Sequence, residues 1–142
     1  MNQFSFPGTG LSAQDERAIS SVLLAYATGI DQRDWRLFQN CFTPDCDADY
    51  GDFGKWHGAA AITAYMKQAH AQLGPTLHRM SNIDIRARED SVQVRCYVDA
   101  VLTALPPGDT THRAIGLYED KFVRTGKGWQ IARRTFHPVL LE

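Results

Sequence analysis

The sequence contains no long apolar run. No stretch approaches the roughly 18 consecutive apolar residues that a membrane-spanning helix needs. The first eleven residues also lack the basic start and the apolar centre of a secretory leader. We therefore expect a soluble protein that works in the cytoplasm.

A surplus of charge of either sign is also absent. The chain carries 15 Lys and Arg against 16 Asp and Glu, which gives a formal net charge of -1. No segment gathers the basic residues into a run with interleaved aromatics, the pattern typical of surfaces that bind nucleic acid or anionic lipid. We therefore expect neither nucleic acid nor a membrane as a partner.

Cysteine is scarce, with Cys41, Cys46 and Cys96 as its three members. An odd number of cysteines, in a chain long enough to form a core without cross-links, argues against a disulfide framework. Cys41 and Cys46 lack the Cys-x-x-Cys spacing of zinc sites, and His57 is the only nearby candidate for a further ligand. The sequence predicts buried or half-buried thiols and no metal site.

The first part of the chain has helical periodicity. Its 142 residues are close to the usual size of one domain, which buries about 70% of the surface exposed by the unfolded chain. Ser12 followed by Asp15 is similar to a capping box, and apolar residues then recur at helical spacing over residues 13–29. Asp31 is expected to cap a second, short helix over residues 33–41.

The remainder predicts one more helix and a series of strands. Gly58 leads into the helix, and the Gly74-Pro75 pair is expected to end it. Gly126-Lys127-Gly128 is a hairpin signal between the last two strands. The expected strands cover residues 48–53, 77–88, 91–105, 112–124 and 129–140. This order predicts one α+β domain over residues 1–142, with an extended arm at 1–11 and helices on one side of an antiparallel sheet.

Three stretches carry a resemblance to a known family. They are AYATGIDQRDW at 25–35, followed by CFTPD, then TLHRMSN at 76–82 and GLYEDKFVRTGKGW at 116–129. Together with the order of elements, they resemble the SnoaL-like proteins of the nuclear transport factor 2-like superfamily. The resemblance implies a cone of helices and curved antiparallel sheet around a pocket for an apolar small molecule. The superfamily hosts dehydratases, dehydrohalogenases, isomerases, cyclases, epoxide hydrolases and binding subunits, so the fold alone does not give the function.

The resemblance also implies a catalytic pair. Asp31 and His78 are similar in placement to the Asp and His shared by scytalone dehydratase, hexachlorocyclohexane dehydrochlorinase and bile-acid 7α-dehydratase. A neutral imidazole can take a C–H proton, and a carboxylate bonded to its other nitrogen fixes the tautomer and stabilises the imidazolium. Tyr26 matches a tyrosine of the bile-acid enzyme and would polarise the substrate. The alternative roles are a helix cap for Asp31, a packed strand histidine for His78 and core packing for Tyr26.

Further pocket residues follow from the same resemblance. Tyr50 resembles a pocket tyrosine of scytalone dehydratase, Asp99 a strand aspartate of the bile-acid enzyme, and Arg134 an arginine of the dehydrochlorinase. The other residues expected to bind substrate are Tyr65, Met80 and Asn82. For Asp99, the alternation along residues 92–102 conflicts with a role in the pocket. The alternation places the Asp99 side chain opposite the buried face, where it would pair with Arg95.

The predicted function is a lyase without organic cofactor or metal, which eliminates water from a small, apolar, cyclic hydroxylated substrate. The alternatives are an isomerase or cyclase that uses the same pocket, and a ligand-binding or partner subunit without activity. An isomerase of the steroid type would need a carboxylate base where Tyr50 stands, which weakens that alternative. The sheet face with Tyr97, Val101 and Leu117 is apolar enough to predict a homodimer.

Overall fold

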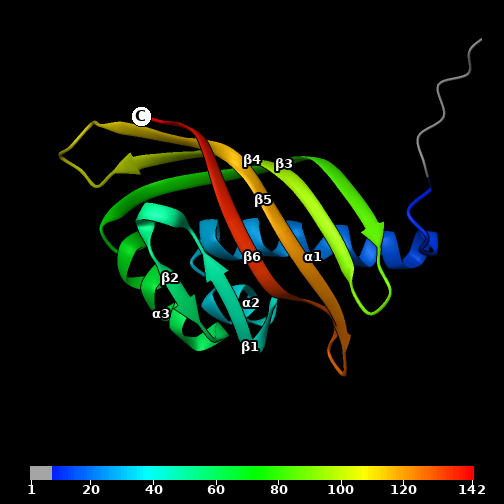
Figure 1. Cartoon of the computed structure of the whole chain (residues 1–142). Coiled ribbons are helices and arrows are strands. Elements are labelled where there is room, and N and C mark those ends of the chain that lie inside the picture. Colours follow the sequence, from blue (N-terminus) through cyan, green and yellow to red (C-terminus); the bar gives the residue numbers. More distant parts are fainter. Residues whose placement is uncertain (1–7) are drawn as a thin grey trace, which may run out of the picture.

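The computed structural model describes residues 8–142, and the part of the predicted N-terminal arm at residues 1–7 lies outside them. Figure 1 shows the helices gathered on one side of a curved sheet, which confirms the predicted α+β class. The elements in chain order are α1 (Ala13–Gln32), α2 (Trp35–Asn40), β1 (Phe42–Asp49), the 3₁₀ turn η1 (Gly51–Phe53), β2 (Lys55–His57), α3 (Ala59–His70), β3 (Leu73–Ala87), β4 (Val92–Ala104), β5 (Thr111–Thr125) and β6 (Gly128–Leu141).

The sheet is mixed rather than wholly antiparallel. Its strand order is β2-β1-β6-β5-β4-β3, and the last four strands of the chain form the predicted antiparallel meander. β1 pairs with β2 in antiparallel and with β6 in parallel orientation. The prediction of a purely antiparallel sheet is therefore wrong at one pair. That pair joins strands from the two ends of the chain, and the turn signals report only pairing between neighbours in sequence.

α1 begins where the sequence predicts and ends later. The Ser12 hydroxyl accepts a hydrogen bond from the Asp15 backbone N–H at 3.1 Å, which confirms the N-terminal cap. The helix continues past the predicted end at residue 29 to Gln32. It stops at Arg33, whose φ of 59° lies in the left-handed region common at helix C-termini.

Gly29 has a packing role instead of a terminating one. A Cβ at this position would lie 2.9 Å from the backbone nitrogen of Phe38, so the missing side chain lets α2 approach α1 closely. α2 is capped by Asp34, which accepts from the Leu37 N–H at 3.0 Å. The prediction that Asp31 caps this helix is therefore wrong, because Asp31 lies inside the last turn of α1.

The boundary between α3 and β3 also differs from the prediction. α3 ends at His70, and Gly74 and Pro75 belong to β3. A Cβ on Gly74 would meet the carbonyl oxygen of Ala104 at 2.5 Å, so the glycine serves the close approach of β4. Pro75 is tolerated because β3 is an edge strand. The strand expected over 48–53 starts earlier, as β1, and gives way to η1.

The hydrophobic core lies between the helices and the inner face of the sheet. The three cysteines are free and buried, as predicted. None of the helices within residues 8–142 is both long enough and apolar enough to cross a bilayer. Fully buried aliphatic and aromatic side chains in this core include Ile19, Leu23, Phe38, Ile62, Val94 and Phe122.

Candidate active site

A cavity of about 230 Å³ lies between α1, α3 and the inner face of the sheet. Its volume is below the roughly 300–1,000 Å³ of pockets for drug-sized ligands, so it suits a small ring compound. Most of its wall is aliphatic or aromatic and includes Ile30, Met66, Leu73, Val98, Leu102 and Phe136. Its polar wall residues are two histidines and four tyrosines, namely His70, His78, Tyr26, Tyr50, Tyr65 and Tyr118.

Asp31 and His78 form a hydrogen-bonded pair at this wall. Oδ1 of Asp31 lies 2.7 Å from Nδ1 of His78, and Oδ2 accepts from the His78 backbone N–H at 2.8 Å. Because an ionised carboxylate only accepts hydrogen bonds, Nδ1 carries a proton, and Nε2 has a free lone pair whenever the ring is neutral. Both side chains are well shielded from solvent, at 7% exposure for His78 and 15% for Asp31. This arrangement can accept a proton from a ligand at Nε2.

Two further side chains hold the Asp31 carboxylate in place. Thr76 donates its hydroxyl to Oδ1 of Asp31 at 2.9 Å, and Arg33 donates to the Thr76 hydroxyl at 2.8 Å. Arg33 also donates to the Gly74 carbonyl at 2.7 Å, which ties the end of α1 to β3. Burial alone would raise the pKa of Asp31, but the hydrogen bonds from His78 and Thr76 outweigh it and lower that pKa. Asp31 is therefore ionised at neutral pH.

Three tyrosine hydroxyls meet inside the protein. Tyr26 Oη lies 2.9 Å from Tyr50 Oη and 3.1 Å from Tyr118 Oη. Burial raises the pKa of all three phenols well above the usual value, so they stay protonated. All three residues line the cavity and can supply hydroxyl donors to a ligand. Sequence reasoning missed Tyr118, although alternation with buried Asp120 and Phe122 places it on the inner face of β5.

Arg134 lies behind the tyrosines and is fully buried. Its Nε and Nη2 donate to the two carboxylate oxygens of Asp120 at 2.8 and 2.7 Å. Its guanidinium carbon lies 3.8 Å from the ring centroid of Tyr118 and 4.3 Å from that of Tyr26. Burial alone would lower the pKa of Arg134, but the carboxylate of Asp120 holds it above the usual value. The arginine therefore contacts the cavity tyrosines while remaining outside the cavity wall.

His70 is a second cavity histidine that the sequence analysis missed. It ends α3, and its Nδ1 lies 2.9 Å from the Met66 carbonyl oxygen. Its ring centroid is 6.1 Å from that of His78. Burial lowers the pKa of His70 to about 4, so the ring is neutral at physiological pH. The available signal was its spacing of four residues from Met66, which itself follows Ile62 by four on the buried face of α3.

The predicted site residues divide into two groups. Tyr26, Tyr50, Tyr65 and His78 line the cavity, and Asp31 is bonded to His78. Met80 packs against the hydrophobic core instead. The predicted site residues that do not form part of the cavity wall are Met80, Asn82, Asp99 and Arg134.

Asp99 lies on the outer face of the sheet. Its carboxylate accepts from Arg79 at 3.0 Å and from Arg113 at 3.3 Å. The alternation along β4 therefore gave the correct face, but the predicted partner was wrong, since Arg95 pairs with Glu119 at 2.6 Å. Partner choice depends on strand register, which alternation does not determine.

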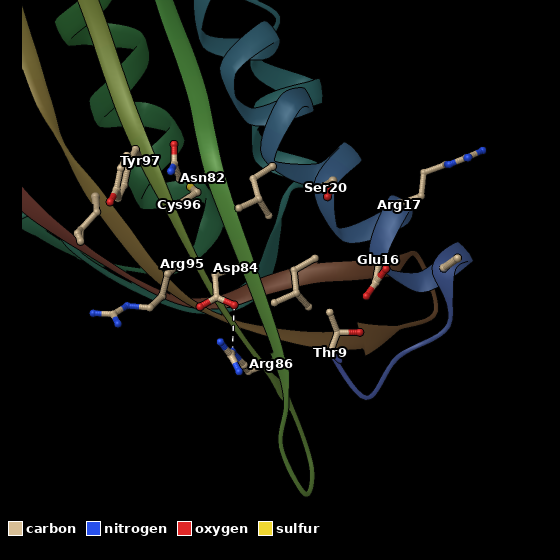
Figure 2. A pocket seen from close by; sticks show the side chains of 14 residues that line it. Thr9, Glu16, Arg17, Ser20, Asn82, Asp84, Arg86, Arg95, Cys96 and Tyr97 are labelled. Atoms are coloured by element: carbon tan, nitrogen blue, oxygen red, sulfur yellow. Dashed lines mark hydrogen bonds and ion pairs between the residues drawn. The ribbon is translucent and has the colours of Figure 1, made fainter. Parts of the chain in front are cut away.

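Asn82 belongs to a separate hollow on the surface (Figure 2). This open depression of about 1000 Å³ lies between the start of α1 and strands β3 and β4. Asn82 has a φ of 51° and sits at a register shift between β3 and β4, which interrupts the alternation that would have aligned it with His78. Figure 2 shows charges of both signs around the hollow, including the paired Asp84 and Arg86. Neither Asp31 nor His78 contributes to it.

The fold is shared with solved structures of low sequence identity. A proposed scytalone dehydratase from Novosphingobium aromaticivorans has a TM-score of 0.83 and 22% identity, covering 91% of this chain and 87% of that one. The hexachlorocyclohexane dehydrochlorinase LinA-type3 from Novosphingobium barchaimii has a TM-score of 0.80 and 14% identity, covering 92% and 93%. The fold is therefore the nuclear transport factor 2-like cone, here with an open sheet.

Sequence comparison identifies the family, within this fold, to which the chain belongs. The SnoaL-like domain matches residues 12–135. An uncharacterized protein of Mycobacterium tuberculosis strain H37Rv, Rv2910c, is 32% identical over 125 residues, which are 84% of this chain and 82% of that protein. The chain belongs to the SnoaL-like domain family, as the sequence motifs predicted.

Proposed function

We propose that this protein is a cofactor-independent lyase that eliminates water from a small, apolar, cyclic hydroxylated substrate. The observation that supports this most directly is the 2.7 Å bond between Asp31 and His78 at the wall of an apolar cavity. The names of two proteins with this fold, a dehydratase and a dehydrochlorinase, both describe eliminations. The mainly apolar wall of the cavity suits a substrate with few polar groups.

The position of Asp31 supports a chemical rather than a helix-stabilising role. A carboxylate in the last turn of a helix faces the negative end of the helix dipole, which costs about 0.3–1 kcal/mol. The guanidinium of Arg33 donates to the Ile30 and Asp31 carbonyl oxygens and offsets part of this cost, and α2 has its own cap in Asp34. The Asp31 carboxylate therefore caps neither α1 nor α2, and its hydrogen bonds are to Thr76 and His78.

The proposed reaction uses Nε2 of His78 as the base. This nitrogen removes the proton from the carbon next to the substrate carbonyl, and Asp31 stabilises the imidazolium that forms. The bond to the leaving hydroxyl then breaks as the carbon–carbon double bond forms. The imidazolium returns its proton to the departing hydroxyl, so water leaves and neutral His78 is restored. The reaction needs no oxidant and no external acid.

The tyrosine cluster provides the polarising donors. Developing negative charge on the substrate carbonyl oxygen is stabilised by hydroxyl donors that are already oriented. Tyr26 is held by both Tyr50 and Tyr118, so its orientation is set before substrate binds. Their raised pKa values keep the three hydroxyls protonated, and therefore able to donate, at neutral pH.

The experiment uses a cyclic β-hydroxy ketone, 3-hydroxycyclohexanone, whose dehydration gives a conjugated enone that absorbs ultraviolet light. His78→Ala should lower kcat by the roughly 10² to 10⁴-fold that general acid–base catalysis supplies. Asp31→Asn should also lose most activity, because it removes the charge that stabilises imidazolium. Wild-type protein without enone formation, or full activity in either variant, would contradict the proposal.

A second Asp–His pair provides matched controls. His57 and Asp47 are joined by a bond of 2.8 Å, but both side chains are largely exposed and lie away from the cavity. His57→Ala and Asp47→Asn repeat the same chemical changes outside the site. They should leave kcat and KM unchanged, so a loss in these variants would indicate general damage rather than loss of a base.

The alternatives give different products. An isomerase would return the proton to another carbon, and the product would keep its oxygen. A cyclase would close a ring by adding a carbanion to a second carbonyl, which becomes a hydroxyl, so the product would keep all the atoms of the substrate. A binding subunit without activity would bind the ketone and leave it intact in every variant. Mass spectrometry of the product, which loses one water only in the proposed reaction, separates these cases.

We propose that the protein is a cytoplasmic homodimer. Free, buried cysteines suit a reducing compartment. The outer face of β3 and β4 exposes Leu77 at 64% and Tyr97 at 54%, with Leu117 partly exposed beside them. Burial of these side chains against a second copy would remove apolar surface from water.

A further inference from the structure

His70 has a buried nitrogen without a hydrogen-bond partner. The residue is 7% exposed and lines the cavity, yet its Nε2 meets no donor or acceptor among the described residues. A buried polar atom left unpaired costs about 1–3 kcal/mol. Because His70 lines the cavity, we expect the missing partner to come from the molecule that occupies the cavity.

The bond on the other side of the ring determines what Nε2 can bind. Nδ1 lies 2.9 Å from the Met66 carbonyl oxygen, which can only accept, so Nδ1 carries the proton. In the neutral ring Nε2 is then an acceptor and not a donor. Burial lowers the pKa of His70 to about 4, and the nearby positive charge of Arg33 acts in the same direction. The ring stays an acceptor at neutral pH.

We propose that His70 is a substrate-binding residue whose Nε2 accepts a hydrogen bond from a hydroxyl or N–H group that stays on the substrate. This inference rests on the proposed function only for the identity of the cavity as the substrate site. The ring centroids of His70 and His78 are 6.1 Å apart, so the bound group lies near the reacting carbon. The substrate class is then an apolar ring that carries a second donor group close to the site of elimination.

The acceptor character of His70 makes the cavity selective. A ring hydroxyl satisfies Nε2, whereas a carbonyl oxygen, an ether oxygen or a halogen leaves it unpaired. Sites that hydrogen-bond a hydroxyl discriminate against analogues that lack it, because a buried polar group of the protein is then left without a partner. Hydroxylated rings are therefore preferred over halogenated or methylated rings of similar shape.

Phenol and anisole test this preference directly. Both are small enough for a cavity of about 230 Å³, and they differ in whether the oxygen carries a donor hydrogen. For the wild-type protein, calorimetry should give a Kd for phenol about fivefold lower than that for anisole, the value of one neutral hydrogen bond. His70→Phe keeps a ring of similar size and should abolish the difference. His57→Phe makes the same change at the exposed histidine and should retain it.

A spectroscopic measurement on the unmodified protein avoids any folding defect of a variant. The ¹⁵N resonance of an unprotonated imidazole nitrogen moves upfield when it accepts a hydrogen bond. Saturation with phenol should shift the Nε2 resonance of His70 in this direction, and anisole should not. The resonance of His57 should be insensitive to both probes.

The outcomes separate this proposal from that of lyase activity. A phenol preference that persists in His70→Phe, or an Nε2 resonance that phenol does not move, would overturn the role of His70 whatever the enzyme does. Conversely, a phenol-dependent shift at His70 in a protein that never forms enone would support His70 as a ligand contact and contradict the lyase. Binding and turnover are thus tested by independent measurements.

Discussion

The buried ion pair of Asp120 and Arg134 gives a prediction that can be worked out from the structure. Both side chains are fully shielded from solvent, and two hydrogen bonds of 2.8 and 2.7 Å join them. Asp120→Asn removes the negative charge and leaves a buried guanidinium, which does not lose its proton in proteins. Loss of one partner of a buried pair costs about 3–5 kcal/mol.

This cost should be measurable by thermal and urea unfolding. With an unfolding entropy near 2.1 cal/mol/K per residue over the 142 residues of this chain, a loss of about 3–5 kcal/mol corresponds to a decrease in Tm of about 10–17 °C. Because Arg134 also contacts the rings of Tyr26 and Tyr118, binding of phenol should weaken in the same variant. A loss of unfolding free energy below about 1 kcal/mol would refute the reasoning.

Two controls separate the buried charge from other effects. The neighbouring residue of β5, Glu119, pairs with Arg95 at 2.6 Å on the surface, where the side chains are 35% and 53% exposed. Glu119→Gln should cost less than about 1 kcal/mol, because exposed pairs contribute little. The double variant Asp120→Leu/Arg134→Met removes both charges and should recover most of the stability that Asp120→Asn loses.

Three further predictions follow from other parts of the fold. Because the pKa of Asp31 is lowered in the folded protein, the stability that its carboxylate contributes is complete above the unfolded pKa of about 3.9 and is lost as pH falls through the folded pKa. The difference in unfolding free energy between wild type and Asp31→Asn should therefore shrink when urea titrations move from pH 6 to pH 3. A difference independent of pH would contradict this. Gly29→Ala places a Cβ 2.9 Å from the Phe38 nitrogen and should lower the free energy of unfolding by about 1–3 kcal/mol, whereas Gly126→Ala, with open space around it, should change it little. Sedimentation at micromolar concentration should show a dimer that Tyr97→Asp weakens, and a monomer in the wild-type protein would count against the homodimer.

Local sequence signals predicted the elements whose contacts are close in the chain. Ser12 capped α1 as expected because its partner lies three residues away. The meander of β3 to β6 followed from turn signals between consecutive strands. The predicted ends of α1 and α3 were wrong by a few residues. Gly29 and Gly74 were expected to mark helix ends, but each glycine allows close packing between two elements.

The candidate pair came from the resemblance to a family and not from spacing. Asp31 and His78 are 47 residues apart, a separation that says nothing about their distance in space. The resemblance did not extend to every position that it suggested. Asp99 and Arg134 occupy strands whose facing residues depend on register, and the register is fixed only when the whole sheet assembles.

The sequence by itself therefore determined the family, the α+β class and the residue types available for acid–base chemistry. Tertiary structure decided the parallel pairing of β1 with β6, the burial of Arg134 behind the tyrosines, and the unpaired nitrogen of His70. The physical reason is that these features arise from contacts between segments distant in the chain. Periodicity and turn residues describe only each segment's own conformation, whereas burial and hydrogen-bond partners depend on what packs against it.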